Sequence, residues 1–178
     1  MLSSPYSLAE LNKRVESFRG AQEGRVRKYR KQIHTDAEKK STKTDWWDMP
    51  LTVCSCGSRR PPFLAANGRN CSALKAPHPV LESAYMNIMY NGKVIGSIPL
   101  GRKPGNKIKG ILGMKGADSF EAGRCAEPHA VNSLLNEARK MGATFRIPDI
   151  LFSVALDARY PIIKDYCVTC QCVFPQLR

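Results

Sequence analysis

The chain of 178 residues is long enough for one domain with a short additional segment. Its hydrophobic fraction of 43% is that of a globular protein, and no apolar run approaches the roughly 20 residues of a membrane-spanning helix. The N-terminus lacks the charged and then apolar layout of a secretory signal, and the seven cysteines are an odd number. These features disfavour a membrane protein and a disulfide-framed secreted domain, and they predict a protein of a reducing compartment such as the cytoplasm.

The net charge of +13 comes from 28 basic and 15 acidic residues. Such an excess favours a polyanionic partner, with a nucleic acid or a nucleotide as the first candidate. A solvated basic surface or a basic tail is the alternative interpretation.

Residues 1–45 are predicted to be a basic N-terminal segment, helical or flexible. Ser7 and Glu10 suit the two positions of a capping box, and residues 25–31 are strongly cationic. The adjacent Trp46 and Trp47 are expected to pack onto the core. We therefore place a domain boundary near them, with a second unit at 46–178.

Short elements are expected in the first half of this unit. Phe63–Ala66 is predicted to be a strand that ends in a turn at Asn67-Gly68. A helix is predicted to begin at Pro79 and to end near Asn91-Gly92; a hairpin turning at Asn91-Gly92 is the alternative. Lys93–Ile98 is predicted to be a strand, and residues 99–116 a flexible cationic loop.

The clearest predicted helix follows Cys125. Apolar residues recur at helical spacing from Val131 to Met141, and Gly142 suits the end of the helix. Ile150–Leu156 is almost continuously apolar, which is typical of a strand covered on both faces.

Three thiols and one carboxylate have the spacing of a hydrolytic zinc site. Cys125 stands two residues before Glu127, at the start of the predicted helix, and Cys167 and Cys170 form a Cys-x-x-Cys pair. Three thiolates can bind one Zn²⁺ per chain and leave a fourth position for water. Glu127 would then move protons to and from that water, as in a deaminase.

Other cysteine and histidine residues are further candidates for metal binding. Cys172 is an alternative ligand to one of the three cysteines, whereas His129 is expected to lie on another helix face. Three further cysteines, in a region read as loops, are expected to be free thiols, with a second metal site as the alternative: Cys54, Cys56 and Cys71.

These motifs resemble the zinc-dependent cytidine deaminase superfamily. Arg124-Cys125-Ala126-Glu127 resembles its first zinc motif, in an all-cysteine form, and Cys167-Val168-Thr169-Cys170 resembles the second. Upstream, Arg60-Pro61-Pro62-Phe63-Leu64-Ala65 and Pro77-His78-Pro79-Val80-Leu81 are similar to YwqJ-like deaminases of bacterial polymorphic toxins. The similarity covers roughly residues 59–178. Tyr166 stands where the family has a proline before its second motif.

The resemblance implies an α/β fold, a three-layer α-β-α sandwich with a central mixed sheet. It also implies hydrolytic deamination of a nucleobase, with cytosine in a single-stranded nucleic acid as the first candidate substrate. By position, Cys125, Cys167 and Cys170 would hold the zinc and Glu127 would be catalytic. Asn67 and Asn70 would contact a sugar or base. A toxin-like role implies an inhibitory or immunity protein as a partner, and delivery of the enzyme into a target cell.

Two rival hypotheses remain open. A non-catalytic zinc protein on a deaminase scaffold, binding nucleic acid or a protein, would not need Glu127. A thiol-redox protein using Cys167 and Cys170 would leave Cys125 and Glu127 without a role.

Overall fold

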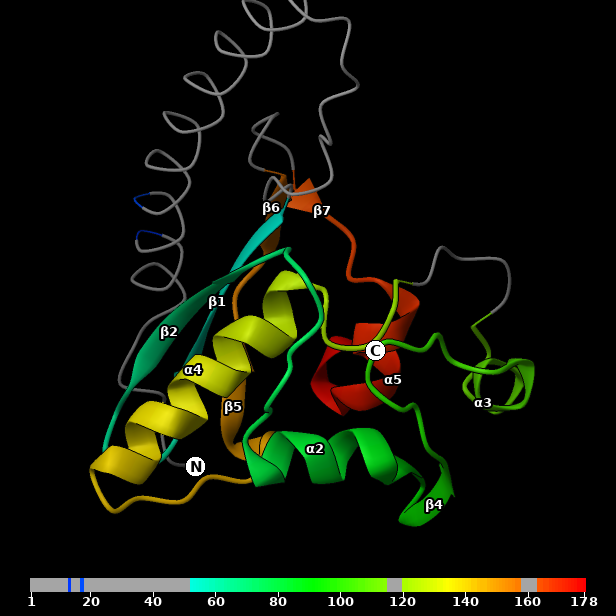
Figure 1. Ribbon diagram of the computed structural model, residues 1–178, viewed down its shortest axis with the longest axis horizontal. Helices are drawn as coiled ribbons and strands as arrows, with labels where there is room; N and C mark the ends of the chain where they lie inside the picture. The colour runs from blue at the N-terminus through cyan, green and yellow to red at the C-terminus, as the bar shows by residue number, and fades with distance from the viewer. Residues whose placement is uncertain (1–12, 14–16, 18–51, 115–119, 158–162) are drawn as a thin grey trace, which may run out of the picture.

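The computed structural model describes residues 13, 17, 52–114, 120–157 and 163–178. The predictions for the capping box, the cationic run 25–31, the two tryptophans and the boundary near residue 46 lie outside these residues. Within them the chain forms a mixed α/β structure with one five-stranded sheet, one two-stranded sheet and several helices (Figure 1). The predicted α/β class is therefore confirmed at this level.

The central strand of the larger sheet is β1 (Thr52–Ser58), and all seven of its residues are buried. It pairs along one edge with β2 (Ala65–Arg69) and along the other with β5 (Ile150–Phe152) and β6 (Ala155–Asp157), and β6 pairs in turn with β7 (Ile163–Lys164). Every pair formed by the described strands is antiparallel. The mixed sheet that the resemblance implied is not seen in this part of the chain.

A bulge divides the single strand that we predicted at Ile150–Leu156. Between the pairs Cys56–Phe152 and Val53–Leu156, β1 advances by three residues and its partner by four. The hydroxyl of Ser153 accepts from the amide of Ser55 at 3.1 Å and donates to the carbonyl of Ser55 at 3.0 Å, so a side chain completes the ladder at the bulge.

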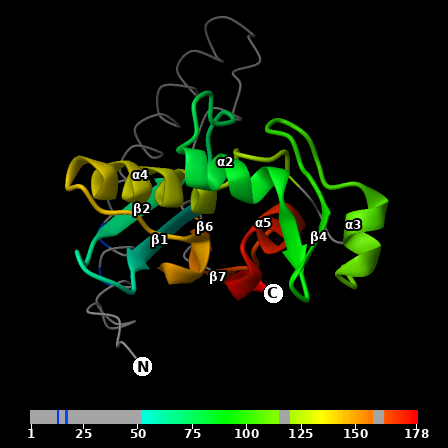
Figure 2. The ribbon, with the colours of Figure 1, turned by 90° about the horizontal axis from the view of Figure 1, so that it is seen from below.

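The long helix α4 (Ala126–Lys140) packs across β1 and β2 and confirms the predicted helix after Cys125 (Figures 1 and 2). It buries Val131, Leu134 and Leu135 against the sheet. Gly68 makes this crossing close: a Cβ atom added there would lie 1.9 Å from the carbonyl oxygen of Ala126. The prediction of a turn at Asn67-Gly68 is thus wrong, because both residues lie inside β2 and the glycine provides room for a helix.

A helix and a hairpin share the segment in which we preferred a single helix. α2 (Pro79–Met86) is followed by β3 (Ile88–Tyr90) and β4 (Lys93–Gly96). Asn91 and Gly92 have φ values of 47° and 73°, which suit the two-residue turn between these strands. The helix was predicted correctly, but its end was placed too late.

The remaining elements lie beside this layer. α3 (Asn106–Ile111) replaces part of the loop predicted at 99–116, and α5 (Val168–Val173) follows β7. Two 3-10 turns, Ile147–Asp149 (η2) and Pro175–Leu177 (η3), lead into β5 and toward the C-terminus. Both ribbon views place α5 between α4 and α3 (Figures 1 and 2). No described helix is long and apolar enough to cross a membrane.

Candidate metal centre

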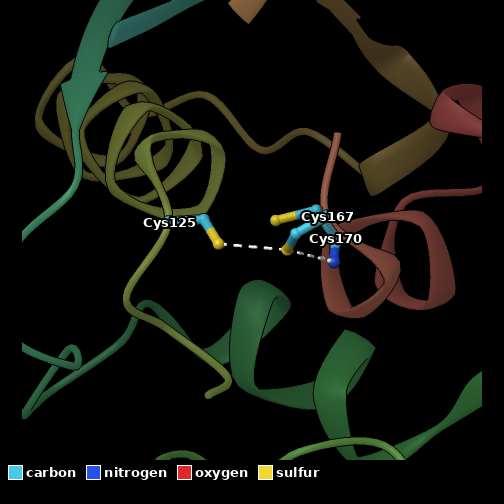
Figure 3. A group of neighbouring side chains, drawn as sticks. All are labelled: Cys125, Cys167 and Cys170. Atoms are coloured by element: carbon cyan, nitrogen blue, oxygen red, sulfur yellow. Dashed lines mark hydrogen bonds between the residues drawn. The ribbon is translucent and has the colours of Figure 1, made fainter. Parts of the chain in front are cut away.

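The N-termini of α4 and α5 face each other and carry the three predicted cysteines. Cys125 is the N-cap of α4, Cys167 is the N-cap of α5, and Cys170 lies in the first turn of α5. Their side chains point toward one another from the two helices (Figure 3). Because helix N-termini carry partial positive charge, they favour thiolate ligands at these positions once a cation is bound.

The three sulfur atoms lie within 4.8 Å of one another, and the Sγ atoms of Cys125 and Cys167 are 3.1 Å apart. A tetrahedral zinc with bonds of about 2.3 Å separates its sulfur ligands by about 3.8 Å. The spacing therefore fits a metal ion bound by three thiolates. Among the described residues, this is the one group of three or more Cys, His, Asp or Glu side chains with such spacing.

The thiols influence one another's protonation. Hydrogen bonds from Cys125 and Cys170 lower the pKa of Cys167, whose amide partner on Cys170 lies 3.4 Å from the sulfur. The hydrogen bond to Cys167 raises the pKa of Cys125, and burial raises that of Cys170. The thiolate form is thus favoured at Cys167, which faces the thiol of Cys125 and the backbone amide of Cys170. A divalent cation would replace the protons that Cys125 and Cys170 carry.

Glu127 is an acidic residue in direct contact with this cluster. Its side chain is only 3% exposed, and its Oε2 atom lies 3.4 Å from the Sγ of Cys170, which donates to it. Burial raises the pKa of Glu127 to about 7. A carboxyl group in this state can both accept and release a proton near neutral pH.

The loop before Cys125 is fixed by packing on both sides. The amide of Gly123 donates to the hydroxyl of the buried Tyr85 at 3.1 Å. Gly123 has a φ of 85°, and there is little room for a side chain, since an added Cβ would lie 3.2 Å from the amide nitrogen of Leu74. The glycine therefore allows the sharp turn that delivers Cys125 to the start of α4.

A small cavity of about 20 Å³ opens beside the cluster, enough for about one water molecule. Its lining combines two of the cysteines, Glu127 and five further residues: Thr52, Asn70, Phe120, Lys164 and Asp165. A larger apolar groove of about 550 Å³ follows α2 and η2, but its lining includes none of the site residues, so volume does not locate the chemistry.

The structure brings only one of the two predicted substrate-binding asparagines to the cavity. Asn70 donates from Nδ2 to the hydroxyl of Thr52 at 3.1 Å, and its buried Oδ1 has no hydrogen-bond partner. An unsatisfied buried acceptor can be completed by a donor on a ligand. Asn67, in contrast, accepts a hydrogen bond from Ser55 within the sheet and does not line the cavity.

The other candidate ligands lie elsewhere. Cys172 is buried near Met114, and Cys54 and Cys56 lie in β1, not in the loops that we expected. His129 faces Cys71, with Nε2 3.1 Å from its sulfur. These placements agree with the expectation that His129 lies away from the three-cysteine site.

Tyr166 is anchored by its hydroxyl to the carbonyl of Ser153 and by its carbonyl to the side chain of Gln171, at 2.6 Å. Phe120, Thr52, Lys164 and Asp165 were not predicted. Lys164 and Asp165 stand just before Cys167 in the sequence, which is the only local signal they offer.

Comparison with known proteins gives no relative: no family model, curated protein or solved structure matches the chain. The function must therefore be argued from the site itself.

Proposed function

We propose that the protein is a zinc-dependent hydrolytic deaminase of a nucleobase, with cytosine in a single-stranded nucleic acid as its first candidate substrate. The observation that carries this proposal is the buried Glu127 carboxyl group beside three convergent thiols and a cavity of the size of a water molecule. The same proposal takes the described α/β layer as part of a cytidine deaminase-like sandwich.

Three thiols alone would be compatible with many zinc proteins, and Glu127 is the residue that distinguishes a hydrolytic site from these. No basic side chain forms an ion pair with Glu127 within the described residues. Burying a carboxyl group without a cationic partner costs stability, and titratable groups with strongly shifted pKa values gather at active sites. A zinc that only stabilises the fold has no need of this residue.

Cys125, Cys167 and Cys170 would hold the metal, and two of these cysteines, Cys125 and Cys167, line the cavity. When bound, zinc is a Lewis acid that brings the pKa of a water molecule close to neutral. Glu127 would take a proton from water and pass it to the ring nitrogen and then to the leaving amine. Water would replace the exocyclic amine, so that cytosine and water yield uracil and ammonia.

Asn70 is suited to holding the substrate. Asn70 lines the cavity, and its buried, unpartnered Oδ1 can accept a hydrogen bond from an amine or a hydroxyl group. Because its Nδ2 is already fixed on Thr52, the direction of this acceptor is set before a ligand arrives.

Thiol redox chemistry is the second candidate, because two sulfur atoms only 3.1 Å apart are close to disulfide formation. It leaves the contact between Cys170 and Glu127 unexplained.

The test is deamination by the purified, zinc-loaded protein, with single-stranded DNA, single-stranded RNA and free cytidine as separate substrates. We expect uracil and an equal amount of ammonia from at least one of them. Glu127→Gln should keep one zinc per chain and lower turnover by about 100- to 10,000-fold. Glu137→Gln, at an exposed carboxylate near the other end of α4, is the matched control and should leave most of the activity. Turnover unchanged in Glu127→Gln would refute the assigned role.

A further inference from the structure

The mouth of the candidate site carries basic side chains on several segments. Lys164 lines the cavity, and Arg124 directly precedes Cys125. The exposed Arg102 and Lys103 belong to a segment that is hydrogen-bonded to the chain leading to Cys125. The amide of Gly101 donates to the carbonyl of Ala122 at 3.0 Å, and the amide of Ala122 donates to the carbonyl of Arg102 at 2.8 Å. The charges of this segment are therefore held next to the site.

Among the described residues, ion pairs account for Arg124 but not for Arg102 and Lys103. Glu121 forms an ion pair with Arg124 at 2.8 Å. The hydrogen bond and positive charge of Arg124, together with the charge of Lys103, lower the pKa of the Glu121 carboxyl group. Arg102 and Lys103 make no ion pair with any described residue. The described segment from 83 to 114 contains no acidic residue at all.

The basic surface continues outward from the site. Beyond Lys103, α3 adds Lys107 and Lys109, and both ribbon views place α3 on the far side of α5 from α4 (Figures 1 and 2). A free nucleotide presents its phosphates at one point only. A row of cations that leads away from a site matches instead the repeated phosphates of a polynucleotide.

Phe120 supplies an aromatic surface at the same mouth. Its side chain is 44% exposed and borders the cavity, and its carbonyl accepts a hydrogen bond from the hydroxyl of Thr169, between Cys167 and Cys170. The backbone at Phe120 is thereby tied to the metal-site helix. Since the cavity has room for about one water molecule, a base ring that reaches it must lie across the mouth, within reach of this phenyl ring.

We propose that a single-stranded nucleic acid binds along this rim, with one base stacked on Phe120 and its phosphates on Arg124, Arg102, Lys103 and α3. This inference rests on the proposed function for the position of the target base, but the binding itself does not depend on turnover. A base stacked on an aromatic side chain needs no sequence-specific contact, so the rim would accept many sequences.

The test measures binding of the full-length, zinc-loaded Glu127→Gln protein to fluorescein-labelled 12-nucleotide single-stranded DNA and RNA by fluorescence anisotropy. Phe120→Leu should weaken binding about 5- to 150-fold, because leucine keeps the apolar area of the side chain but cannot stack on a base. Phe120→Tyr keeps the aromatic ring and should keep the binding. Phe63→Ala is the control, since Phe63 is exposed to a similar extent, 40%. It precedes the start of β2, whereas the cavity residue Asn70 follows the end of that strand.

A second pair of variants tests the charges. The double variant Arg102→Gln, Lys103→Gln should reduce the salt dependence of binding, the slope of log K against log salt, by about 1.4. The control double variant Arg139→Gln, Lys140→Gln removes the same charge at the far end of α4, about 20 Å from Cys125, and should not change the slope. The control also accounts for any binding by the cationic N-terminal segment.

Equal effects of the rim and control variants would overturn the inference, even if the wild type deaminates free cytidine. Selective weakening by the rim variants would support it, even if no cytosine were converted, in which case the proposed function alone would fail. Zinc content and a thermal melt of each variant show that the fold is kept.

Discussion

Cys125, Cys167 and Cys170 lie at the N-termini of two helices, whereas Cys54 and Cys56 lie in the central strand of the sheet. The first group converges within 4.8 Å, and its thiols share hydrogen bonds. The second pair is fully buried, and burial raises the pKa of both thiols. In one chain, the same side chain is thus a candidate metal ligand where backbone amides converge, and an apolar packing residue where a sheet surrounds it.

The largest expected difference between the two groups is in their reactivity toward a thiol reagent. In the metal-free protein, N-ethylmaleimide should modify Cys167, which is only half-buried and has a lowered pKa. Cys54 and Cys56 should react only when the protein unfolds. Because unfolding costs about 5–15 kcal/mol, their modification should be at least about 1,000-fold slower than that of Cys167. Peptide mass spectrometry with and without added zinc measures both rates. Zinc should protect Cys167 and should leave Cys54 and Cys56 as they were. Modification of Cys54 or Cys56 at the rate of Cys167 would contradict the comparison.

Zinc binding itself should separate the groups. Cys170→Ser should weaken zinc binding on the order of 100-fold, because it replaces one thiolate of the ligand set. Cys56→Ser should keep one zinc per chain. Competition with a chromophoric chelator measures both affinities. A loss of zinc in Cys56→Ser with the fold intact would place the metal elsewhere.

The crossing of α4 over β2 should couple the sheet to the metal centre. Gly68→Ala forces a methyl group to within 1.9 Å of the carbonyl oxygen of Ala126, so α4 must move away from the sheet. We expect a loss of about 3 kcal/mol in the free energy of unfolding, together with weaker zinc binding through the shift of Cys125. Gly110→Ala, in α3 with nothing near the added methyl, should leave zinc binding unchanged. Denaturant titration of both variants, with chelator competition, tests this coupling. An unaltered affinity in Gly68→Ala would show that the cluster tolerates displacement of α4.

The smallest effect concerns the two strand cysteines themselves. The sulfur of Cys54 lies 3.5 Å from the carbonyl oxygen of Ser55, whereas the thiol of Cys56 has no hydrogen-bond partner among the described residues. A serine hydroxyl at 54 can therefore bond to a carbonyl, but one at 56 is buried unsatisfied. We expect Cys56→Ser to lower the free energy of unfolding by about 1–3 kcal/mol, and Cys54→Ser by less. Equal losses in denaturant titrations would remove the proposed difference in environment.

The parts predicted correctly from the sequence are those with strong local signals. The apolar periodicity after Cys125 predicted α4, and the spacing of Cys125, Glu127, Cys167 and Cys170 predicted which side chains meet. A helix beginning at Pro79 was also predicted, because proline suits the first turn.

The errors occur where distant parts of the chain decide the local structure. Gly68 is inside a strand because a helix crosses there, and Ile150–Leu156 is divided because Ser153 completes the ladder opposite Ser55. Neither partner is close in sequence. The same applies to Thr52 and Phe120, whose place at the cavity depends on folding and has no motif.

Zinc-edge X-ray absorption of the purified, zinc-loaded protein tests the central claim most directly, because it counts the ligands of the metal. The account predicts one zinc per chain with three sulfur neighbours at about 2.3 Å and one oxygen or nitrogen neighbour at about 2.0 Å, a set that leaves a position for chemistry. Four sulfur neighbours would mean a closed structural site and would contradict the proposed hydrolytic centre, as would a protein that binds no zinc.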